Sequence, residues 1–200
     1  MSTRCQVEFI YKWKDENGKT RSEKRTIYRH SDGYPGSMVP DLLTFIRWNQ
    51  GRMDDVEYTA ANWVFWNKRR DEDCFLNDKR RKKFEERTHN IRWDDPIVAG
   101  DTNHLLKIGI GVDQNNQYHG DIEYLYKVIV QNVQTGEHYN TTRILVESYA
   151  VDRGDWTTPI TSKSFKKIGG IYYHDQMSED EINAAGKKIR DLNDKMKGRE

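Results

Sequence analysis

Several short segments of the chain alternate between hydrophobic and polar positions, which is typical of β-strands with one buried face. In the first of these segments Val7, Phe9 and Tyr11 share one face. Residues 15–18 read Asp-Glu-Asn-Gly, and Asn-Gly is a strong hairpin signal because both residues tolerate a positive φ. We therefore predict a β-hairpin whose strands span 5–14 and 20–29.

Three later segments carry the same strand pattern, and turns rich in Gly, Asn and Asp separate them. They span residues 105–112, 122–131 and 138–150. Strands that follow one another through short turns usually pair in antiparallel fashion. The sequence therefore predicts a mainly antiparallel sheet of about five strands.

Hydrophobic residues recur at intervals of three and four in three other segments, as on the buried face of a helix. We expect the first helix to have its N-cap at Ser37 and the second at Asp54 or Asp55. The last helix, around 178–197, opens with Ser-Glu-Asp-Glu, a capping box. Helices on one face of such a sheet give an α+β fold, and 200 residues suit a single domain, 1–200.

Two hydrophobic features concern surfaces. Phe65 and Trp66 lie off the buried stripe of the second helix, so we expect another part of the molecule to cover them. The narrow stripe of the last helix either packs on the core or grips a partner helix, which would produce an oligomer. Its short length favours core packing.

Residues 68–104 form a charged insertion whose role the sequence leaves open, a mobile flap being one reading. It contains the basic run Lys79–Lys83, which is either a nucleic-acid contact or one side of a solvated helix. Acidic residues flank the run, and a surface that follows phosphates would be expected to lack them. The solvated helix is therefore the favoured interpretation.

Overall charge gives no reason to expect nucleic acid or an anionic membrane as partner, because 33 Lys and Arg balance 32 Asp and Glu. The two cysteines, Cys5 and Cys74, match no disulfide framework or zinc motif. We predict no cofactor and no metal site. We expect neither a signal peptide nor a membrane span, because the first residues form no apolar stretch and no apolar run reaches about 18–20 residues. The expected location is the cytoplasm, or the host cytoplasm if the protein is viral.

The candidate site lies where the second strand is expected to end. Residues 27–36 read Ile-Tyr-Arg-His-Ser-Asp-Gly-Tyr-Pro-Gly, and residues 118–123 read Tyr-His-Gly-Asp-Ile-Glu. Both stretches place His near Asp and Gly, and a carboxylate beside an imidazole fixes its tautomer. Arginine binds phosphate or carboxylate, and the tyrosines offer stacking faces. The predicted ligand-binding residues are Tyr28, Arg29, His30, Asp32, Tyr34, His119, Asp121 and Glu123.

This site requires the two loops to meet at one edge of the sheet. The first loop follows a strand and the second precedes one, so the two strands must run antiparallel to bring them together. If the imidazoles of His30 and His119 lie more than about 15 Å apart, we interpret both loops as ordinary turns without a shared site. Turn chemistry is the main alternative, since Ser-Asp-Gly and His-Gly-Asp are common turn compositions.

Three classes of function remain open. The leading hypothesis is a small accessory protein that binds a nucleotide-like or anionic ligand, or a host partner. The second is a hydrolase or phosphodiesterase in which His30 and His119 are catalytic. The third is a structural or assembly protein that docks through Phe65, Trp66 and the last helix. Neither a nucleophile elbow nor a phosphate-binding loop occurs in the sequence.

The first loop, with its Tyr-Arg-His-x-Asp-Gly-Tyr-Pro pattern running into a helix, resembles an uncharacterised group of prokaryotic and phage proteins. The stretch His-Gly-Asp-Ile-Glu-Tyr at 119–124 resembles a later strand of that group. The resemblance implies a prokaryotic or viral setting, a phage or mobile element among them, and no known activity. It supports the pairing of the two loops.

Overall fold

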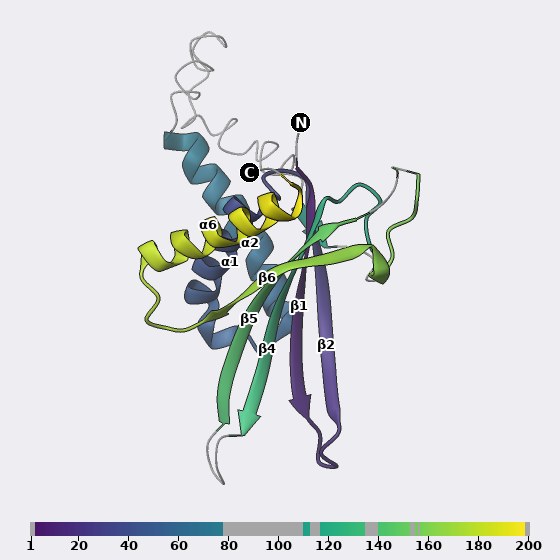
Figure 1. The fold of residues 1–200 in the computed structure, drawn as a ribbon. Coiled ribbons are helices and arrows are strands. Elements are labelled where there is room, and N and C mark those ends of the chain that lie inside the picture. The colour runs from purple at the N-terminus through teal and green to yellow at the C-terminus, as the bar shows by residue number, and fades with distance from the viewer. Residues whose placement is uncertain are drawn as a thin grey trace, which may run out of the picture.

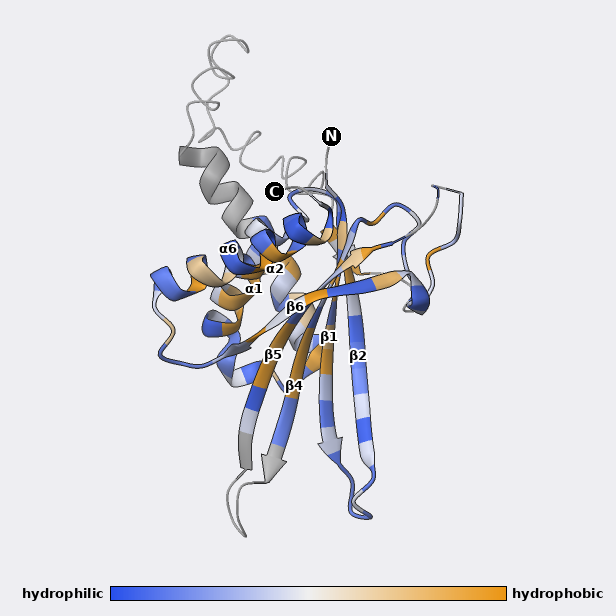
Figure 2. Ribbon diagram, viewed as in Figure 1, coloured by the Kyte–Doolittle hydropathy of each residue, from blue (hydrophilic) through white to orange (hydrophobic). Residues whose placement is uncertain are grey.

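The computed structural model describes residues 3–77, 110–112, 117–134, 140–152, 155 and 157–198. In this part of the chain, helices cover one face of a six-stranded sheet (Figure 1). The α+β architecture predicted from the sequence is therefore confirmed. Figure 2 shows the hydrophobic parts of the strands beside the helices and mostly hydrophilic residues toward the tip of the first hairpin.

The first hairpin consists of β1 (Cys5–Lys14) and β2 (Thr20–Arg29), which pair antiparallel from one end to the other. The Asp15 carboxylate accepts the backbone N–H groups of Asn17 and Lys19, and Gly18 adopts φ +73°. The Arg21 side chain also donates to this carboxylate and is the main cause that lowers the pKa of Asp15. The predicted hairpin and its turn are confirmed.

The remaining strands are β3 (Ile110–Val112), β4 (Tyr124–Gln134), β5 (Asn140–Val151) and β6 (Phe165–Tyr173). Their order across the sheet is β3-β2-β1-β4-β5-β6, and β1 pairs parallel with β4 while the other neighbours are antiparallel. The prediction of about five strands was therefore wrong by one. It missed β6, and the sheet is mixed. The predicted strand at 105–112 is described only from Ile110 onward.

The helices in the described residues are α1 (Pro35–Asn49), α2 (Val56–Asn77) and α6 (Glu179–Met196), with single 3-10 turns at η1 (Gln50–Arg52) and η3 (Ser162–Ser164). The predicted N-cap at Ser37 was wrong: Tyr34 is the N-cap and Pro35 occupies the first turn. Proline suits that position because its missing N–H has no partner there.

Helix α2 continues to Asn77 and so includes the beginning of the segment that was assigned to the charged insertion. The rest of the insertion, with the Lys79–Lys83 run, lies outside the described residues.

The core lies between the sheet and the helices. Phe9 of β1 and Phe45 of α1 pack against Trp63 of α2, with ring centroids 6.2 and 5.0 Å from that of Trp63. Trp66 is half-buried and stacks on Trp63, whereas Phe65 is 53% exposed. The expectation that Phe65 is covered is therefore not met within the described part of the chain. None of the described helices is both long and apolar enough to cross a membrane.

Helix α6 packs on α1 and closes the core, as its hydrophobic spacing favoured. Ile182, Ala185 and Ile189 are buried, and the predicted capping box between Ser178 and Glu181 is present. Gly186 lies where the two helices cross, and a Cβ at this position would overlap the ring of Pro40.

Candidate functional site

Strand order brings the two predicted loops to the same edge of the sheet. Strand β1 lies between β2 and β4, and Cys5 at its start is opposite both Arg29 at the end of β2 and Tyr124 at the start of β4. Strands β2 and β4 therefore run antiparallel to each other. The chain leaves β2 and enters β4 at one edge, on either side of the β1 start.

Tyr28 is the residue that joins the two loops. Its hydroxyl lies 3.1 Å from Nδ1 of His30 and 3.3 Å from Oδ2 of Asp121. Its ring stacks on the imidazole of His119, with centroids 4.3 Å apart and an interplanar angle of 30°. The centroid of His30 is 6.2 Å from that of Tyr28, so the two imidazoles are no further apart than the sum of these distances. That sum is below the limit of about 15 Å set for a shared site.

Arg4 completes this group, and the sequence reasoning missed it. Its Nε lies 3.2 Å from Oδ2 of Asp121 and 3.4 Å from Nδ1 of His30. We call Arg4, Tyr28, His30, His119 and Asp121 the Tyr28 cluster. The signal that would have found Arg4 is its position one residue before β1, between the two loops.

Hydrogen bonds give the two imidazoles opposite tautomers. The guanidinium of Arg4 only donates, so Nδ1 of His30 accepts and the proton of a neutral His30 is on Nε2. Nδ1 of His119 lies 2.7 Å from Oδ1 of Asp121, and this carboxylate only accepts. Nδ1 of His119 therefore carries its proton, and Nε2 of the neutral ring is an acceptor.

The Tyr28 hydroxyl remains protonated at neutral pH. Burial is the main cause that raises the pKa of Tyr28 to about 12, and the neighbouring Asp121 carboxylate adds to it. The hydroxyl is therefore a hydrogen-bond donor inside the cluster, directed to His30 or Asp121.

Hydrogen bonds to the backbone of both loops hold them in place. The buried side chain of Gln6 donates to the carbonyl of Gln117 at 3.0 Å and accepts the N–H of His119 at 3.1 Å. On the other loop, Gly33 donates its N–H to the carbonyl of Thr3, and its own carbonyl accepts the hydroxyl of buried Tyr126 at 2.8 Å.

Gly33 is required at its position by close packing. A Cβ there would lie 2.9 Å from both Cβ of Cys5 and the carbonyl oxygen of Thr3. The preceding residue, Asp32, adopts φ 54°, a left-handed conformation that Asp tolerates better than most residues. The turn that follows His30 is therefore tightly constrained against the start of β1.

The cluster lies at the surface and is accessible from solvent. The side chain of His119 is 49% exposed, and those of Asp121 and Arg4 are 34% and 33% exposed. Among the described residues no group of three or more His, Cys, Asp and Glu is arranged to hold a metal ion. The groups available for chemistry are thus a guanidinium, a carboxylate, a phenol and two imidazoles.

Arg29 does not belong to this cluster. Successive strand residues point to opposite faces of a sheet, so Tyr28 and His30 share one face and Arg29 lies on the helix face. There its Nη1 pairs with Asp41 of α1 at 2.9 Å, and its Nε donates to the carbonyl of Ser31. The ligand-binding fork predicted for Arg29 is therefore not on the face of the Tyr28 cluster, and the guanidinium forms this buried ion pair instead.

Three other predicted residues lie at the margin. Asp32 is exposed in the turn, and Tyr34 is 46% exposed at the N-cap of α1. Glu123 joins the strands through its backbone, donating its N–H to Arg4 and accepting that of Val151. None of the interactions that define the Tyr28 cluster involves the side chains of these residues.

Comparison of the chain with protein-family models, with curated proteins and with solved structures gives no match. The resemblance to the group with the Tyr-Arg-His-x-Asp-Gly-Tyr-Pro pattern therefore stays a prediction, and the functional argument depends on the geometry of the Tyr28 cluster.

Proposed function

We propose that the Tyr28 cluster binds a small anionic ligand that contains a planar ring, such as a nucleotide. The observation that carries this proposal is the position of Tyr28, which contacts His30, His119 and Asp121 from two distant loops. Tight backbone contacts position both loops in advance, so little ordering cost opposes binding. On this interpretation the protein is an accessory factor that captures its ligand.

Each part of the ligand has a matching group. The ring stacks on His119, which presents one face to Tyr28 and is half exposed. The anionic group binds the guanidinium of Arg4, whose planar set of donors suits phosphate or carboxylate. Asp121 forms an ion pair with Arg4 and accepts a hydrogen bond from His119, and in this way it orients both groups.

The proposal is tested with a panel of linear and cyclic nucleotides, by isothermal titration calorimetry with chromatography of the mixture afterwards. We expect at least one member to be retained unchanged. Arg4→Met should weaken its binding by about 10- to 100-fold, which is the effect of a charge-assisted hydrogen bond. Tyr28→Phe should also weaken binding, whereas the control Tyr34→Phe should not. Equal affinity of Arg4→Met and the parent would contradict the assignment.

A second candidate function, hydrolysis of a phosphodiester, is favoured by the presence of two imidazoles in one accessible cluster. In such a reaction Nε2 of His119 would take a proton from the attacking water. His30 would act in its imidazolium form, with its Nδ1–H on the Tyr28 oxygen, and Nε2 would give its proton to the leaving oxygen. Asp121 orients His119 for the base role.

The same assay separates the two functions. Product that disappears in both His30→Ala and His119→Ala, and persists in the control His174→Ala, would favour the hydrolase. Stoichiometric retention of an unchanged nucleotide would favour the binding protein.

A further inference from the structure

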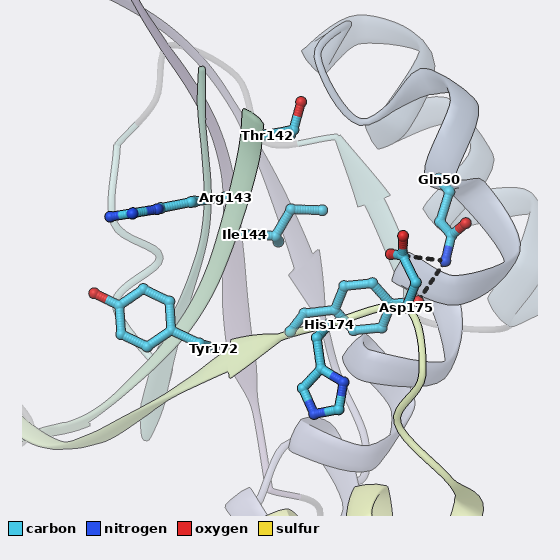
Figure 3. Close-up of a pocket in the computed structure, with 8 residues that line it drawn as sticks. Gln50, Thr142, Arg143, Ile144, Tyr172, His174 and Asp175 are labelled. Carbon is cyan, nitrogen blue, oxygen red and sulfur yellow. Dashed lines mark hydrogen bonds between the residues drawn. The ribbon is translucent and has the colours of Figure 1, made fainter. Parts of the chain in front are cut away.

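A second surface lies at the other end of the sheet, away from the Tyr28 cluster. It is a cleft of about 930 Å³ at the start of β5, the end of β6 and the end of α1. Figure 3 shows Arg143 and Tyr172 on one side of the cleft, Gln50 and Asp175 on the other, and Ile144 between them. Because Ile144 pairs with Val130 late in β4, this cleft is remote from the loop that precedes β4.

The cleft exists because β6 ends before its neighbour does. The last paired residue of β6 is Tyr173, opposite Ile144, while β5 extends back to Asn140. Beyond Tyr173 the chain turns away, with the N–H of Met177 bonded to the carbonyl of His174 at 3.1 Å. In the described part of the chain no strand occupies the position beside the first residues of β5.

The backbone groups of Thr142 face this vacant position. Near the other end of β5, Val151 donates its N–H toward β4, to Glu123, whereas Asp152 donates toward the β6 side, to Ser164. Backbone groups alternate in direction along a strand, and the register of β5 with β4 is uninterrupted. The even-numbered residues of β5 therefore point their N–H and C=O toward β6, and those of Thr142 point into the cleft.

We propose that this edge of β5 binds an extended segment of a partner protein, which adds to the sheet as a strand in line with β6. Strand addition uses free backbone donors and acceptors for affinity and alternating side chains for specificity. Among the described residues none hydrogen-bonds to the outward N–H and C=O of Thr142, and a strand antiparallel to β5 supplies partners for both groups. A small ligand does so only in part. The site is separate from the Tyr28 cluster and does not depend on the function proposed for it.

The side chains at the cleft define the partner. Tyr173 is opposite Ile144 and the chain continues from it through His174, so the first partner residue with room beside β5 is the one opposite Thr142. This residue lies on the helix face beside Ile144, so a β-branched apolar residue fits. The next partner residue, opposite Thr141, shares the sheet face of Arg143 and lies diagonally from it. The exposed guanidinium of Arg143 forms no ion pair with any described residue, so an acidic residue fits at that position.

The probe is the capped peptide Ac-Val-Glu-Val-Thr-NH2, in which the first Val is designed to lie opposite Thr142 and Glu opposite Thr141. Two control peptides are compared with it. One has Lys in place of Glu, and the other carries an N-methyl group on the first Val. Binding is followed by amide chemical shifts of the ¹⁵N-labelled full chain up to millimolar peptide. We expect shifts at Thr142, Ile144 and Tyr173, and an affinity about two- to tenfold lower after N-methylation, the effect of one backbone hydrogen bond.

Matched variants test the edge itself. Thr142→Pro removes the outward N–H, and proline is tolerated where that N–H faces away from the sheet, so this variant should fold and lose the shifts. The control is Thr142→Ala. Like Thr142→Pro, it loses the hydrogen bond from the Thr142 hydroxyl to Asn132, but it keeps the backbone N–H and should still bind the peptide. Arg143→Glu should reverse the preference from the Glu peptide to the Lys peptide.

Three results would overturn the proposal. The first is the absence of shifts with either unmodified peptide. The second is that the N-methylated peptide binds as tightly as the unmodified one, or that Thr142→Pro binds as tightly as the parent protein. Either result would show that the cleft recognises side chains and not a strand. The third is a dimer, found by light scattering, that Thr142→Pro dissociates, because a second copy of the chain would then be the natural occupant.

Discussion

Replacing Arg29 by methionine should destabilise the fold strongly and leave ligand binding by the folded protein intact. The side chain of Arg29 is 8% exposed, and its guanidinium pairs with the carboxylate of Asp41, whose side chain is 16% exposed. Removing one partner of a buried ion pair leaves the other charge poorly compensated and costs about 3–5 kcal/mol. Loss of the bond from Nε to the carbonyl of Ser31 adds about 1 kcal/mol.

Thermal unfolding followed by circular dichroism measures this loss. In a chain of this size each kcal/mol lowers the melting temperature by about 2–4 °C, so the total loss of about 4–6 kcal/mol corresponds to about 8–24 °C. The control is Arg143→Met, which removes an exposed guanidinium and should change stability by no more than about 0.5 kcal/mol. The double variant Arg29→Met with Asp41→Leu should recover at least half of the loss, because apolar pairs replace buried ion pairs well.

A loss below about 1 kcal/mol in Arg29→Met would refute the assignment of a buried structural ion pair. Loss of nucleotide binding by a fully folded Arg29→Met protein would refute the separation of the two sheet faces. The measurement therefore distinguishes the sequence-based role of Arg29, as a ligand-binding fork, from the role that its position on the helix face gives it.

Three further predictions concern helix packing, capping and alkaline pH. Gly186→Ala should lower the free energy of unfolding by about 1–3 kcal/mol, since its Cβ would overlap Pro40. The control is Gly51→Ala, where a Cβ meets open space. Equal melting temperatures of Gly186→Ala and the parent would contradict the close crossing of the helices. Ser178→Ala should cost about 1 kcal/mol and raise the pKa of Glu181, which hydrogen bonds from Ser178 now lower, as measured by NMR titration. The pKa of Tyr28, raised above its unfolded value to about 12, contributes stability that is complete below pH 10 and is lost as pH rises toward 12. Urea unfolding of Tyr28→Phe should thus depend less on pH in this range than that of the parent, and parallel curves would argue against the raised pKa.

The elements that the sequence predicts well are those encoded by adjacent residues. The hairpin of β1 and β2 follows from alternation and a turn whose Asp and Gly satisfy local geometry. The start of α6 follows from a capping box between Ser178 and Glu181. In these cases the stabilising partner lies within about four residues, so the chain carries the signal locally.

Strand β6 was not predicted because it contains two glycines whose role depends on packing against residues far away in the sequence. Gly169 and Gly170 weaken the strand pattern and resemble loop composition. In the fold, a Cβ at Gly169 would lie 2.9 Å from Cδ1 of Ile189, so this glycine allows α6 to approach the sheet closely. The strand also carries a bulge opposite Ser148 and Tyr149, which interrupts its alternation. Contacts of this kind cannot be recognised before the tertiary arrangement is known.

The parallel pairing of β1 with β4 was also beyond local signals, and it determines the composition of the candidate site. Residue types alone identified Tyr28, His30, His119 and Asp121, since His beside Asp and Gly is visible in the sequence. They also included Arg29, because composition carries no information about which face of a strand a residue occupies. Applying the two-residue alternation of β2 to this turn separates Arg29 from its neighbours on either side.

Arg4 follows from topology in the same way. Cys5 lies opposite Arg29 on one side and Tyr124 on the other, so one further step along the register places Arg4 between His30 and Glu123. That step also returns to the face of Tyr28, because Arg4 and Gln6 share parity and Gln6 is opposite Tyr28. An arginine in this position meets an imidazole on one flank and the loop with Asp121 on the other. Its contacts with both are therefore a consequence of inserting β1 between β2 and β4. Replacement of Arg4 is accordingly the change that best separates a ligand site from two turns that merely adjoin.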